Sequence, residues 1–541
     1  MTSMTSVSYI KYSFAILLLV ILVIPIILQY TLKFEITPYI GIYGFYLLIY
    51  IILQMTLALL NNNYRRHLIN TSYIISNTAE MMNLMVVGYK EDPVYYDLCI
   101  KSLKDTDQHL INLNKIIMVI DGNTPDDYYM RDKFMEIFNT NSVCIELFST
   151  PDKDDSILLE HMNLIHAHKY ICIMQPHNGK RVAMYTGFSI SKLEKTIYNH
   201  NIKCIFCTDS DTIVKFENVE NMFKLFENKD IGAVASDLAI YNKYDSLISF
   251  FSSIRYWYAF NLERAYQSYN NCVLCVSGPS GMYRLDSLDQ IMSQWINQSF
   301  LGKICTYGDD RHLTNKILSL KKQIVYMPSN KPMTTETPTS IYRFFQQQTR
   351  WSKSSFREVF WTLPIIDRHS VMMTIDLIYT FIYPFIVIGY LFYILYAGTL
   401  LDFGIYTTIV LILGIIKSLY GCIVAKNSEH LFYFLYIIPY TCIVFPSKLW
   451  ALININDTSW GTSSRKILSK QIHYDSFIII IYNLSLLCGI SYCIYRNLYQ
   501  FSHTQPLSLY LIITTSSIYT ISFIIMLIYV KLMKSYEKKN F

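Results

Sequence analysis

Charged residues are scarce in this 541-residue sequence: Asp, Glu, Lys and Arg together make up 16% of it, and the formal net charge is +6. The chain also lacks a basic stripe with interleaved aromatic residues, which excludes a nucleic-acid partner. Apolar residues fill the difference, at 52% of the chain with a mean hydropathy of +0.26. That value is high for a soluble protein and indicates long apolar runs.

The first apolar run has no small-x-small cleavage site. It covers residues 10–29, and a second run, residues 38–60, follows at once. We therefore predict a membrane anchor rather than a signal peptide. Runs of about twenty residues with almost no charge are long enough to cross a ~30 Å hydrocarbon core. Four more runs meet that length, so six spans are predicted; the other four are residues 371–398, 403–424, 476–495 and 507–530.

Residues 431–452 form one further apolar stretch, which Pro439 and Pro446 interrupt. Lys and Arg favour the cytoplasmic side of a membrane. If this stretch does not cross, the basic residues that flank the spans all lie on that side: Arg65, Arg66, Lys426, Arg465, Lys466, Lys531, Lys534, Lys538 and Lys539. We therefore predict that the stretch is re-entrant or lies at the interface, and that both termini are cytoplasmic.

Between the second and third spans, short apolar runs alternate with longer helical patterns. Residues 84–87, 115–120, 204–208 and 232–235 are predicted to be buried parallel strands of a doubly wound α/β domain. In such sheets, ligands bind beyond the carboxyl ends of the strands. Two amphipathic stretches, 247–264 and 341–361, mix aromatic with basic residues. We predict helices at the membrane interface, with ordinary domain helices as the alternative.

These features divide the chain into four parts. Residues 1–70 hold two membrane helices, and residues 71–335 form the cytosolic α/β domain. Residues 336–368 hold the second amphipathic helix, and residues 369–541 hold the remaining spans together with the interrupted stretch. The α/β domain and the spans therefore have separate places along the chain.

Two carboxylates separated by one residue follow the apolar run 204–208. Asp209 and Asp211 can hold a hard divalent ion through oxygen ligands, and such an ion bridges a diphosphate and stabilises it as a leaving group. Lys180 follows a turn and is a candidate for a phosphate or nucleotide contact. Arg350 offers a fork-shaped donor that suits a pyrophosphate, and Trp351 a flat apolar face that suits a sugar ring.

Asp309 and Asp310 begin a helical pattern after Gly308. A carboxylate near a helix start usually caps the helix. A carboxylate can also act as a general base. If the diphosphate above is the leaving group of a sugar transferred with inversion, the reaction needs one general base within reach of the acceptor hydroxyl. We predict that Asp310 is this base and that Asp309 is its structural partner.

Several motifs resemble one known family when taken in order along the chain. They resemble a processive, inverting family 2 glycosyltransferase and, more closely, the vertebrate type of membrane hyaluronan synthase. The match runs from about residue 80 to 470 and rests on residues 86–91, 119–122, 179–181, 209–211, 242–246, 277–284, 308–315, 335–338, 347–354 and 459–466. One departure is Ser280, where many relatives carry leucine.

The resemblance implies an α/β GT-A-type glycosyltransferase domain combined with an all-α transmembrane channel of about six spans plus interface helices. The enzyme would sit in the plasma membrane with its catalytic domain in the cytosol. One active site would use UDP-GlcA and UDP-GlcNAc in alternation, with Mg²⁺ or Mn²⁺. The nascent polysaccharide would cross the lipid bilayer through a channel that the enzyme's own spans form.

The resemblance also implies roles for individual residues. Asp209 and Asp211 would hold the metal, and Asp310 would be the base. The uridine and phosphates would contact Tyr89, Lys90, Glu91, Asp121 and Lys180. The acceptor and diphosphate would border Gln347, Arg350 and Trp351. A gating loop, residues 458–467, would close over the bound nucleotide through residues that include Trp460, Thr462 and Arg465.

Three alternatives remain open from the sequence. A chitin or chitooligosaccharide synthase would use UDP-GlcNAc only, and a lipid-linked transferase would add a single sugar. A transporter with a nucleotide-binding domain would leave Asp310 and the 347–351 segment unexplained.

Two charged residues, Asp376 and Lys417, fall inside predicted spans, where they either line an exit path or form a pair.

Overall fold

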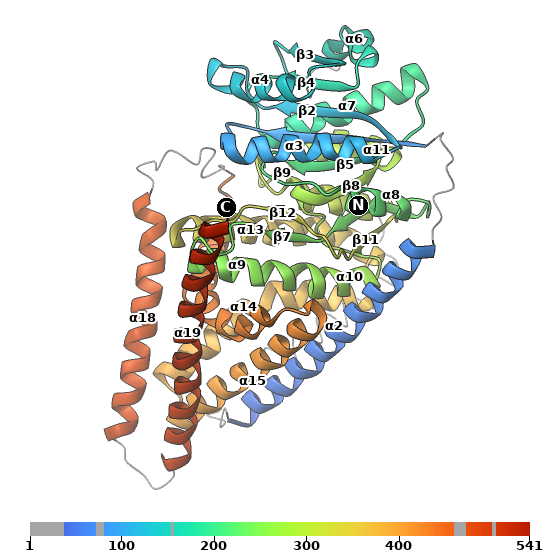
Figure 1. Cartoon of the computed structure of the whole chain (residues 1–541). Coiled ribbons are helices and arrows are strands. Elements are labelled where there is room, and N and C mark those ends of the chain that lie inside the picture. Colours follow the sequence, from blue (N-terminus) through green and yellow to red (C-terminus); the bar gives the residue numbers. More distant parts are fainter. Residues whose placement is uncertain (1–36, 72–79, 153–155, 459–471, 500–504, 541) are drawn as a thin grey trace.

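An α/β domain stands on a group of long helices (Figure 1). The computed structural model describes residues 37–71, 80–152, 156–458, 472–499 and 505–540. Our prediction of an α/β domain joined to apolar membrane helices is confirmed.

The domain is built on an eight-stranded sheet of order β11-β6-β8-β5-β1-β2-β4-β3. Neighbouring strands are parallel except β8, which runs antiparallel to β5 and β6. The four strands predicted from the sequence are β1, β2, β5 and β6. The bounds are β1 Met81–Gly88, β2 Leu113–Ile120, β3 Ser142–Glu146, β4 Tyr170–Met174, β5 Ile202–Asp209, β6 Ile231–Ser236, β8 Gly281–Arg284 and β11 Gln323–Met327.

Helices cover the sheet, which explains why its strands are almost continuously apolar. The longest of them, α7 (Lys180–Tyr198), packs on β1 and β2. At Gly187 a Cβ would lie 2.1 Å from the sulfur of Met85, so only glycine allows α7 to approach β1 this closely. The others are α3 Pro93–His109, α4 Tyr128–Ile137, α5 Ser156–Leu159, α6 Met162–Ala167, α8 Phe216–Leu225, α11 Leu285–Ile296 and α12 Asp309–Ser319.

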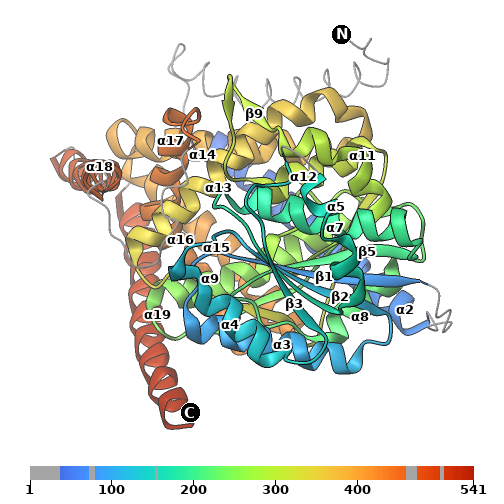
Figure 2. The ribbon, with the colours of Figure 1, turned by 90° about the horizontal axis from the view of Figure 1, so that it is seen from above.

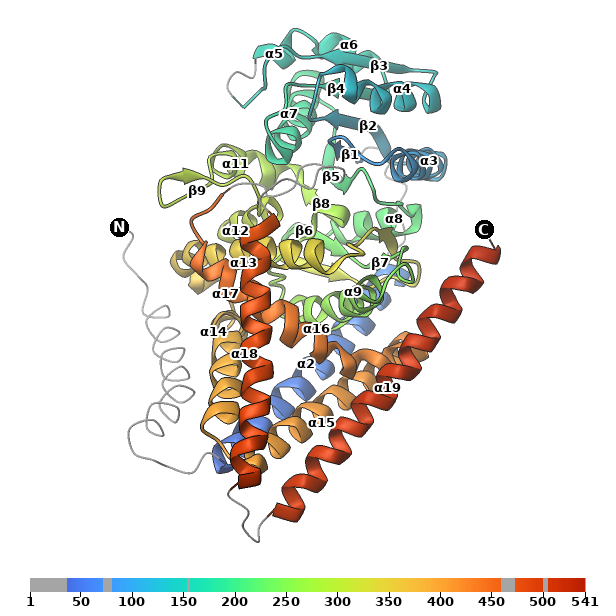
Figure 3. The ribbon, with the colours of Figure 1, turned by 90° about the vertical axis from the view of Figure 1, so that its left-hand side faces the viewer.

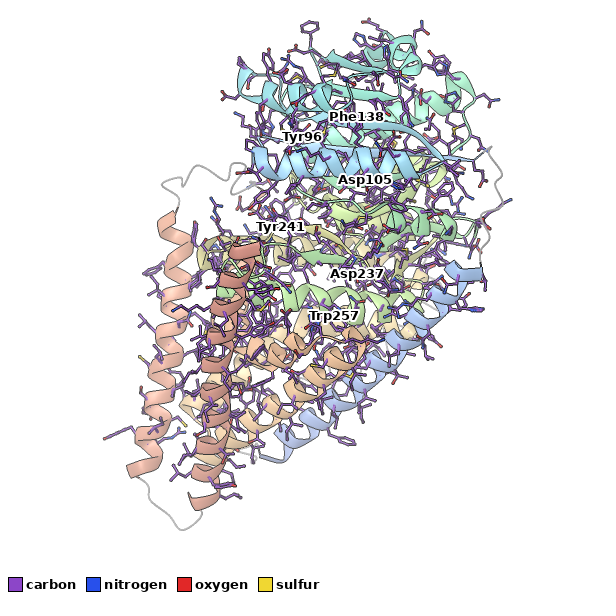
Figure 4. The ribbon with its side chains drawn as sticks, in the orientation of Figure 1. Tyr96, Asp105, Phe138, Asp237, Tyr241 and Trp257 are labelled. Carbon is purple, nitrogen blue, oxygen red and sulfur yellow. The ribbon has the colours of Figure 1, made fainter. Side chains whose placement is uncertain are left out.

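A layer of helices separates the sheet from the long apolar helices. It contains α9 (Leu247–Tyr258), which continues through the π-helix Ala259–Arg264 into α10 (Ala265–Tyr269), and α13 (Ile341–Thr362). Figure 3 shows α9 and α13 between the sheet and the helices below, and Figure 4 shows Trp257 of α9 on this boundary. Both predicted amphipathic helices therefore exist and lie between the two parts of the molecule.

Six helices within the described ranges are long and apolar enough to cross a membrane. Five of them correspond to predicted spans: α2 Thr37–Thr71, α14 Val371–Tyr396, α15 Leu400–Ala425, α18 Ile472–Tyr499 and α19 Gln505–Asn540. The predicted span 10–29 lies outside the described residues. Seen from above, α18 and α19 lie at the outside of the group, α18 against α14 and α19 against α15 (Figure 2).

The sixth candidate, Ser428–Ile453, contains the stretch that we predicted not to cross. Its length and composition suit a span, but its backbone consists of four short pieces, the 3₁₀ helix Ser428–Tyr436, α16 (Ile437–Pro439), the π-helix Tyr440–Val444 and α17 (Phe445–Ile453). α17 packs against α13, and α16 and α17 lie where the α/β domain meets the long helices (Figure 3). An interfacial position stays our prediction.

The two charged residues inside predicted spans do not meet. Asp376 accepts a hydrogen bond from the Tyr50 hydroxyl, whereas the Lys417 ammonium lies 6.0 Å from the centre of the Tyr433 ring. No ion pair between Asp376 and Lys417 is present among the described residues. The structure therefore does not show the ion pair between these two residues that we considered as one option.

Asp237 is a buried carboxylate between β6 and β7 (Leu238–Ile240), and it is labelled in Figure 4. It accepts hydrogen bonds from Asn261 Nδ2 at 3.0 and 3.1 Å and from the Leu238 amide at 2.9 Å. Burial raises its pKa to about 7 despite these donors. A carboxyl whose folded pKa is raised contributes stability that is present at low pH and is lost as pH rises toward the folded pKa.

We expect Asp237→Asn to remove this pH dependence. Between about pH 4 and 7 the unfolded wild-type chain releases a proton that the folded chain keeps, so wild-type stability should fall relative to the variant by roughly a few kcal/mol. Thermal melting of both proteins across this range measures the difference. A constant difference in melting temperature would contradict the raised pKa, and Asp132→Asn, on exposed α4, is the control.

Candidate active site

A single cavity of about 1610 Å³ lies beyond the carboxyl ends of the strands. It continues past α13 to α14, where Asp376 and Phe381 line it. Every predicted site residue within the described ranges lines this cavity, namely Tyr89, Lys90, Glu91, Asp121, Lys180, Asp209, Asp211, Asp310, Gln347, Arg350 and Trp351. The fold therefore brings together side chains from segments far apart in the sequence.

Asp121 follows β2 and holds the turn after β4 in place. Its carboxylate accepts hydrogen bonds from the amides of Asn178 at 3.0 Å and Gly179 at 2.9 Å, and it lies 2.8 Å from His177 Nδ1. The residue is only 2% exposed. The structure thus directs both oxygens of Asp121 toward the turn that precedes α7 and Lys180.

His177 is a cavity residue that sequence reasoning did not single out. Its ring stacks on that of Tyr89, with the centroids 4.1 Å apart and the planes 14° from parallel. The hydrogen bond with Asp121 raises the pKa of His177, against the smaller effect of burial. The position of His177 in a turn after an apolar run was the available signal, but its stacking partner Tyr89 directly follows β1. This pair forms a flat aromatic wall at one end of the cavity.

The predicted metal ligands sit at the end of β5. Lys180 Nζ lies 2.5 Å from Asp209 Oδ1, and Thr335 Oγ1 in β12 (Met333–Thr335) lies 3.3 Å from Asp211 Oδ1. Burial opposes the charge of Lys180, but the carboxylates of Asp209, Asp309 and Asp310 raise its pKa overall. Two carboxylates that line one cavity, one of them already against a cation, fit a hard divalent ion with oxygen ligands.

Asp310 lies in the first turn of α12. Gly308 precedes the helix with φ +85°, and a Cβ there would lie 2.4 Å from Ser354 Oγ, so a side chain would push α12 away from α13. Asp310 Oδ1 accepts a hydrogen bond from the Arg311 amide at 2.8 Å. Its other oxygen lies 3.4 Å from Cys275 Sγ and lines the cavity.

The two neighbours of Asp310, Asp309 and Cys275, are both buried. Asp309 is 5% exposed, and its carbonyl accepts a hydrogen bond from Trp295 Nε1 at 2.9 Å. Burial and the neighbouring Asp310 raise the pKa of Cys275 to about 11, so this thiol keeps its proton at neutral pH. It donates to Asp310 and helps to orient that carboxylate.

α13 presents Gln347, Arg350 and Trp351 to the cavity. Burial lowers the pKa of Arg350, while the Asp309 and Asp310 carboxylates oppose that effect. An arginine with a pKa far above neutral remains charged, so it can attract a diphosphate. The Trp351 ring lies 6.0 Å from that of Tyr256 and is 38% exposed, which leaves an apolar face accessible.

Residues 454–458 bring the chain to the rim of the cavity. Lys353 Nζ donates to Asp457 Oδ2 at 2.8 Å, and Arg357 Nη2 donates to the Asp457 carbonyl at 2.6 Å. The Tyr307 hydroxyl donates to the same carbonyl at 2.8 Å. Three predicted site residues, Trp460, Thr462 and Arg465, follow this anchored segment and lie outside the described residues.

We expect Asp121→Asn to raise the KM for the substrate that this cavity binds. Asparagine has one acceptor oxygen, so the turn loses at least one charge-assisted hydrogen bond, and the pKa of His177 falls without the carboxylate. Such bonds contribute about 1.5–3 kcal/mol, which corresponds to roughly tenfold or more in binding. Initial-rate kinetics measure the change, with Asp132→Asn as the control. An unaltered KM would show that the turn does not depend on this carboxylate.

The chain is similar to a family model and to several relatives. A family model described as chitin synthase matches residues 153–476. Hyaluronan synthase 1 of Xenopus laevis is 35% identical over 514 residues, covering 90% of this chain and 85% of the relative. Hyaluronan synthase 2 of Homo sapiens is 36% identical over 468 residues, covering 84% and 82%.

A solved structure also aligns with the chain. It is the mannosyltransferase PcManGT from Pyrobaculum calidifontis in complex with GDP-Man and Mn²⁺, at 12% identity and a TM-score of 0.39. The alignment covers 74% of this chain and 95% of that one.

Proposed function

The chain belongs to the hyaluronan synthase family of glycosyltransferases, and from this premise we propose that it polymerises UDP-GlcA and UDP-GlcNAc in alternation into hyaluronan. It is a multi-pass membrane protein. The observation that carries the proposal is the single cavity, because it connects the carboxylates of Asp209 and Asp310 with the apolar helix α14.

The proposed reaction is an inverting transfer. The acceptor hydroxyl oxygen attacks the anomeric carbon of the UDP-sugar and forms the new glycosidic bond. The bond from that carbon to the phosphate oxygen breaks, and UDP leaves with its electron pair. Asp310 accepts the proton of the hydroxyl. Cys275 and the Arg311 amide hold the carboxylate in position.

Other residues of the chain bind and orient the donor. Asp209 and Asp211 would hold Mg²⁺ or Mn²⁺, which when bound offsets the charge that develops on the diphosphate. Lys180 and Arg350 supply fixed positive charges on the cavity wall. The aromatic wall of Tyr89 and His177 offers a flat surface for the uracil ring, and Lys90 and Glu91 lie next to it.

Export of the polymer is proposed to follow the same cavity. It passes the exposed face of Trp351 and reaches Asp376 and Phe381 on α14. A sugar ring packs well against an aromatic face, so Trp351 would support the acceptor end. In this proposal the enzyme works in the plasma membrane, with its α/β domain in the cytosol.

The 458–467 loop is proposed to close over bound nucleotide from the cytoplasmic side. Its support is the anchoring of Asp457 at the cavity rim by Lys353 and Arg357. Closure would exclude water and favour transfer over hydrolysis. We expect Arg465→Ala to reduce synthesis more than thermal stability. Labelling of Ser464→Cys from the outside of intact cells would overturn this topology.

Product analysis tests the proposed function. Purified protein should make long polymer only when both UDP-sugars and a divalent ion are present, and a hyaluronan-specific lyase should digest it. Long polymer from UDP-GlcNAc alone would instead identify a chitin synthase. A product with one added sugar would identify a single-sugar transferase. If no UDP is released, the protein is not a glycosyltransferase.

A further inference from the structure

Three potential metal ligands gather on the side of the domain away from the active site. His166 lies on α6, Glu194 on the last turns of α7, and His200 in the connection from α7 to β5. Their ligand atoms all lie within 4.8 Å of one another. The cluster is next to Lys115, at the beginning of β2, whereas the active site lies beyond the other ends of the strands.

The separations within this cluster are too long for hydrogen bonds. His166 Nδ1 lies 3.6 Å from Glu194 Oε1, and His200 Nδ1 lies 4.0 Å from Glu194 Oε2. Protein hydrogen bonds between nitrogen and oxygen span about 2.7–3.2 Å. Ligands of a tetrahedral zinc ion, each about 2.0–2.2 Å from the metal, stand roughly 3.4 Å apart. These two separations lie nearer to the spacing of metal ligands than to that of hydrogen bonds, and all three ligand atoms lie within 4.8 Å of one another.

The same atoms also need partners. His166 Nδ1, His200 Nδ1 and Glu194 Oε1 are buried and make no hydrogen bond within the described part of the chain. Glu194 is 0% exposed, and the charge facing its Oε1 is the ammonium of Lys115, 3.3 Å away. A bound ion would give a partner to both imidazole nitrogens and a second cationic partner to the Glu194 carboxylate.

The neighbours of Glu194 hold its carboxylate in place. Asn114 Nδ2 donates to Oε2 at 3.1 Å, and Lys115 Nζ lies 3.3 Å from Oε1. Lys115 also donates to the carbonyls of Ile165, His166 and His168. It thereby fixes the backbone that carries His166, while its positive charge lowers the affinity for a cation.

We propose that His166, Glu194 and His200 form a second metal site, which binds a borderline transition ion of the Zn²⁺ type. Two imidazoles and one carboxylate are a ligand set that zinc accepts, with water in the fourth position. The imidazole side chains of His166 and His200 are 36% and 27% exposed, so the cluster lies close to solvent although the Nδ1 atoms are buried. The Asp209 and Asp211 pair offers only oxygen and suits Mg²⁺ or Mn²⁺, so the two sites differ in the ion they select.

Zinc titration of the purified full-length protein tests the site. Excess Mg²⁺ is kept present to occupy the carboxylates of the active site. We expect wild type to bind about one Zn²⁺ per chain by calorimetry, and to melt at a higher temperature with Zn²⁺ than without it. Asp209→Asn should bind this Zn²⁺ as wild type does.

Two variants remove a ligand while keeping an aromatic ring. His166→Phe preserves the stacking on Tyr198, where the centroids are 3.7 Å apart, and His200→Phe keeps a ring of similar size. Each should weaken Zn²⁺ binding by at least about tenfold and abolish the Zn²⁺-dependent rise in melting temperature. His168→Ala is the matched control, because its Nδ1 lies 2.8 Å from the Leu164 carbonyl and outside the cluster.

The inference is overturned if wild type binds no Zn²⁺ in excess Mg²⁺. It is equally overturned if both phenylalanine variants, folded as judged by their melting without Zn²⁺, bind the ion as wild type does. In the first case Lys115 and Asn114 satisfy the carboxylate without an ion, and in the second the ion binds elsewhere. Neither result bears on which polymer the enzyme makes.

Discussion

Asp310→Asn should yield a folded protein that binds UDP-sugar but does not extend the chain. Asparagine keeps the size of the side chain and an oxygen that can accept from the Arg311 amide, now 2.8 Å away. It cannot take a proton at neutral pH. Base catalysis typically contributes ~10²–10⁴-fold, and the polymer yield should fall in that range or beyond.

Three measurements on one preparation separate a catalytic role from a structural one. If Asp310 only caps α12, its loss costs roughly 1 kcal/mol of stability with little change in rate. Nucleotide binding, thermal melting and polymer yield distinguish these results. If Asp310→Asn gives near-normal polymer yield with a lowered melting temperature, another residue is the general base. Asp309→Asn is the matched comparison, since Asp309 is buried beside Trp295 rather than facing Cys275.

Asp209→Asn and Asp211→Asn should each abolish most metal-dependent synthesis. Each substitution replaces an anionic oxygen ligand with a neutral amide, which weakens the hold on a hard divalent ion. Loss of charge stabilisation at a leaving group commonly costs roughly 10²–10³-fold in kcat. Titrating Mg²⁺ and Mn²⁺ against UDP release measures the effect, and higher metal concentration should recover part of the activity.

Asp209 and Asp211 have different neighbours in the cavity, so the two variants should also differ from each other. Asp209→Asn also removes the ion partner of Lys180, so it should weaken metal-dependent nucleotide binding and also change the position of the Lys180 ammonium. Asp211→Asn leaves that pair intact and changes the contacts of Asp211 with Thr212 and Thr335. Full activity of either variant at low metal concentration would exclude that residue as a ligand. Asp230→Asn, on an exposed turn before β6, serves as the control.

Local patterns in the sequence were sufficient to locate most elements and many cavity residues. The strands β1, β2, β5 and β6 and five of the long helices were recognised because a buried element needs an apolar run of a particular length. Asp121, Asp209 and Asp310 were recognised because polar residues directly follow such runs or begin a helix. The family resemblance then suggested roles for them, and the relatives confirmed the family.

Contacts between distant segments were not visible in these patterns. His177 became a cavity residue only because the sheet order places the turn after β4 close to Tyr89 at the end of β1. The direction of the Asp121 carboxylate toward the turn likewise depends on that order. Residues 428–453 have the composition of a span, yet the structure breaks them into short helices, the first packed against α15 and the last two against α13.

Residue types and their spacing were enough to predict the class of this protein, its α/β domain, its apolar helices and the carboxylates at the strand ends. These features depend on residue type and spacing within one segment, where burial and hydrogen bonding act locally. Which side chains face one another, in contrast, depends on how the whole elements pack. That packing joined Tyr89 to His177, Cys275 to Asp310, and His166 to Glu194 and His200. Such pairs form when the packing of whole elements brings together residues that no local pattern connects.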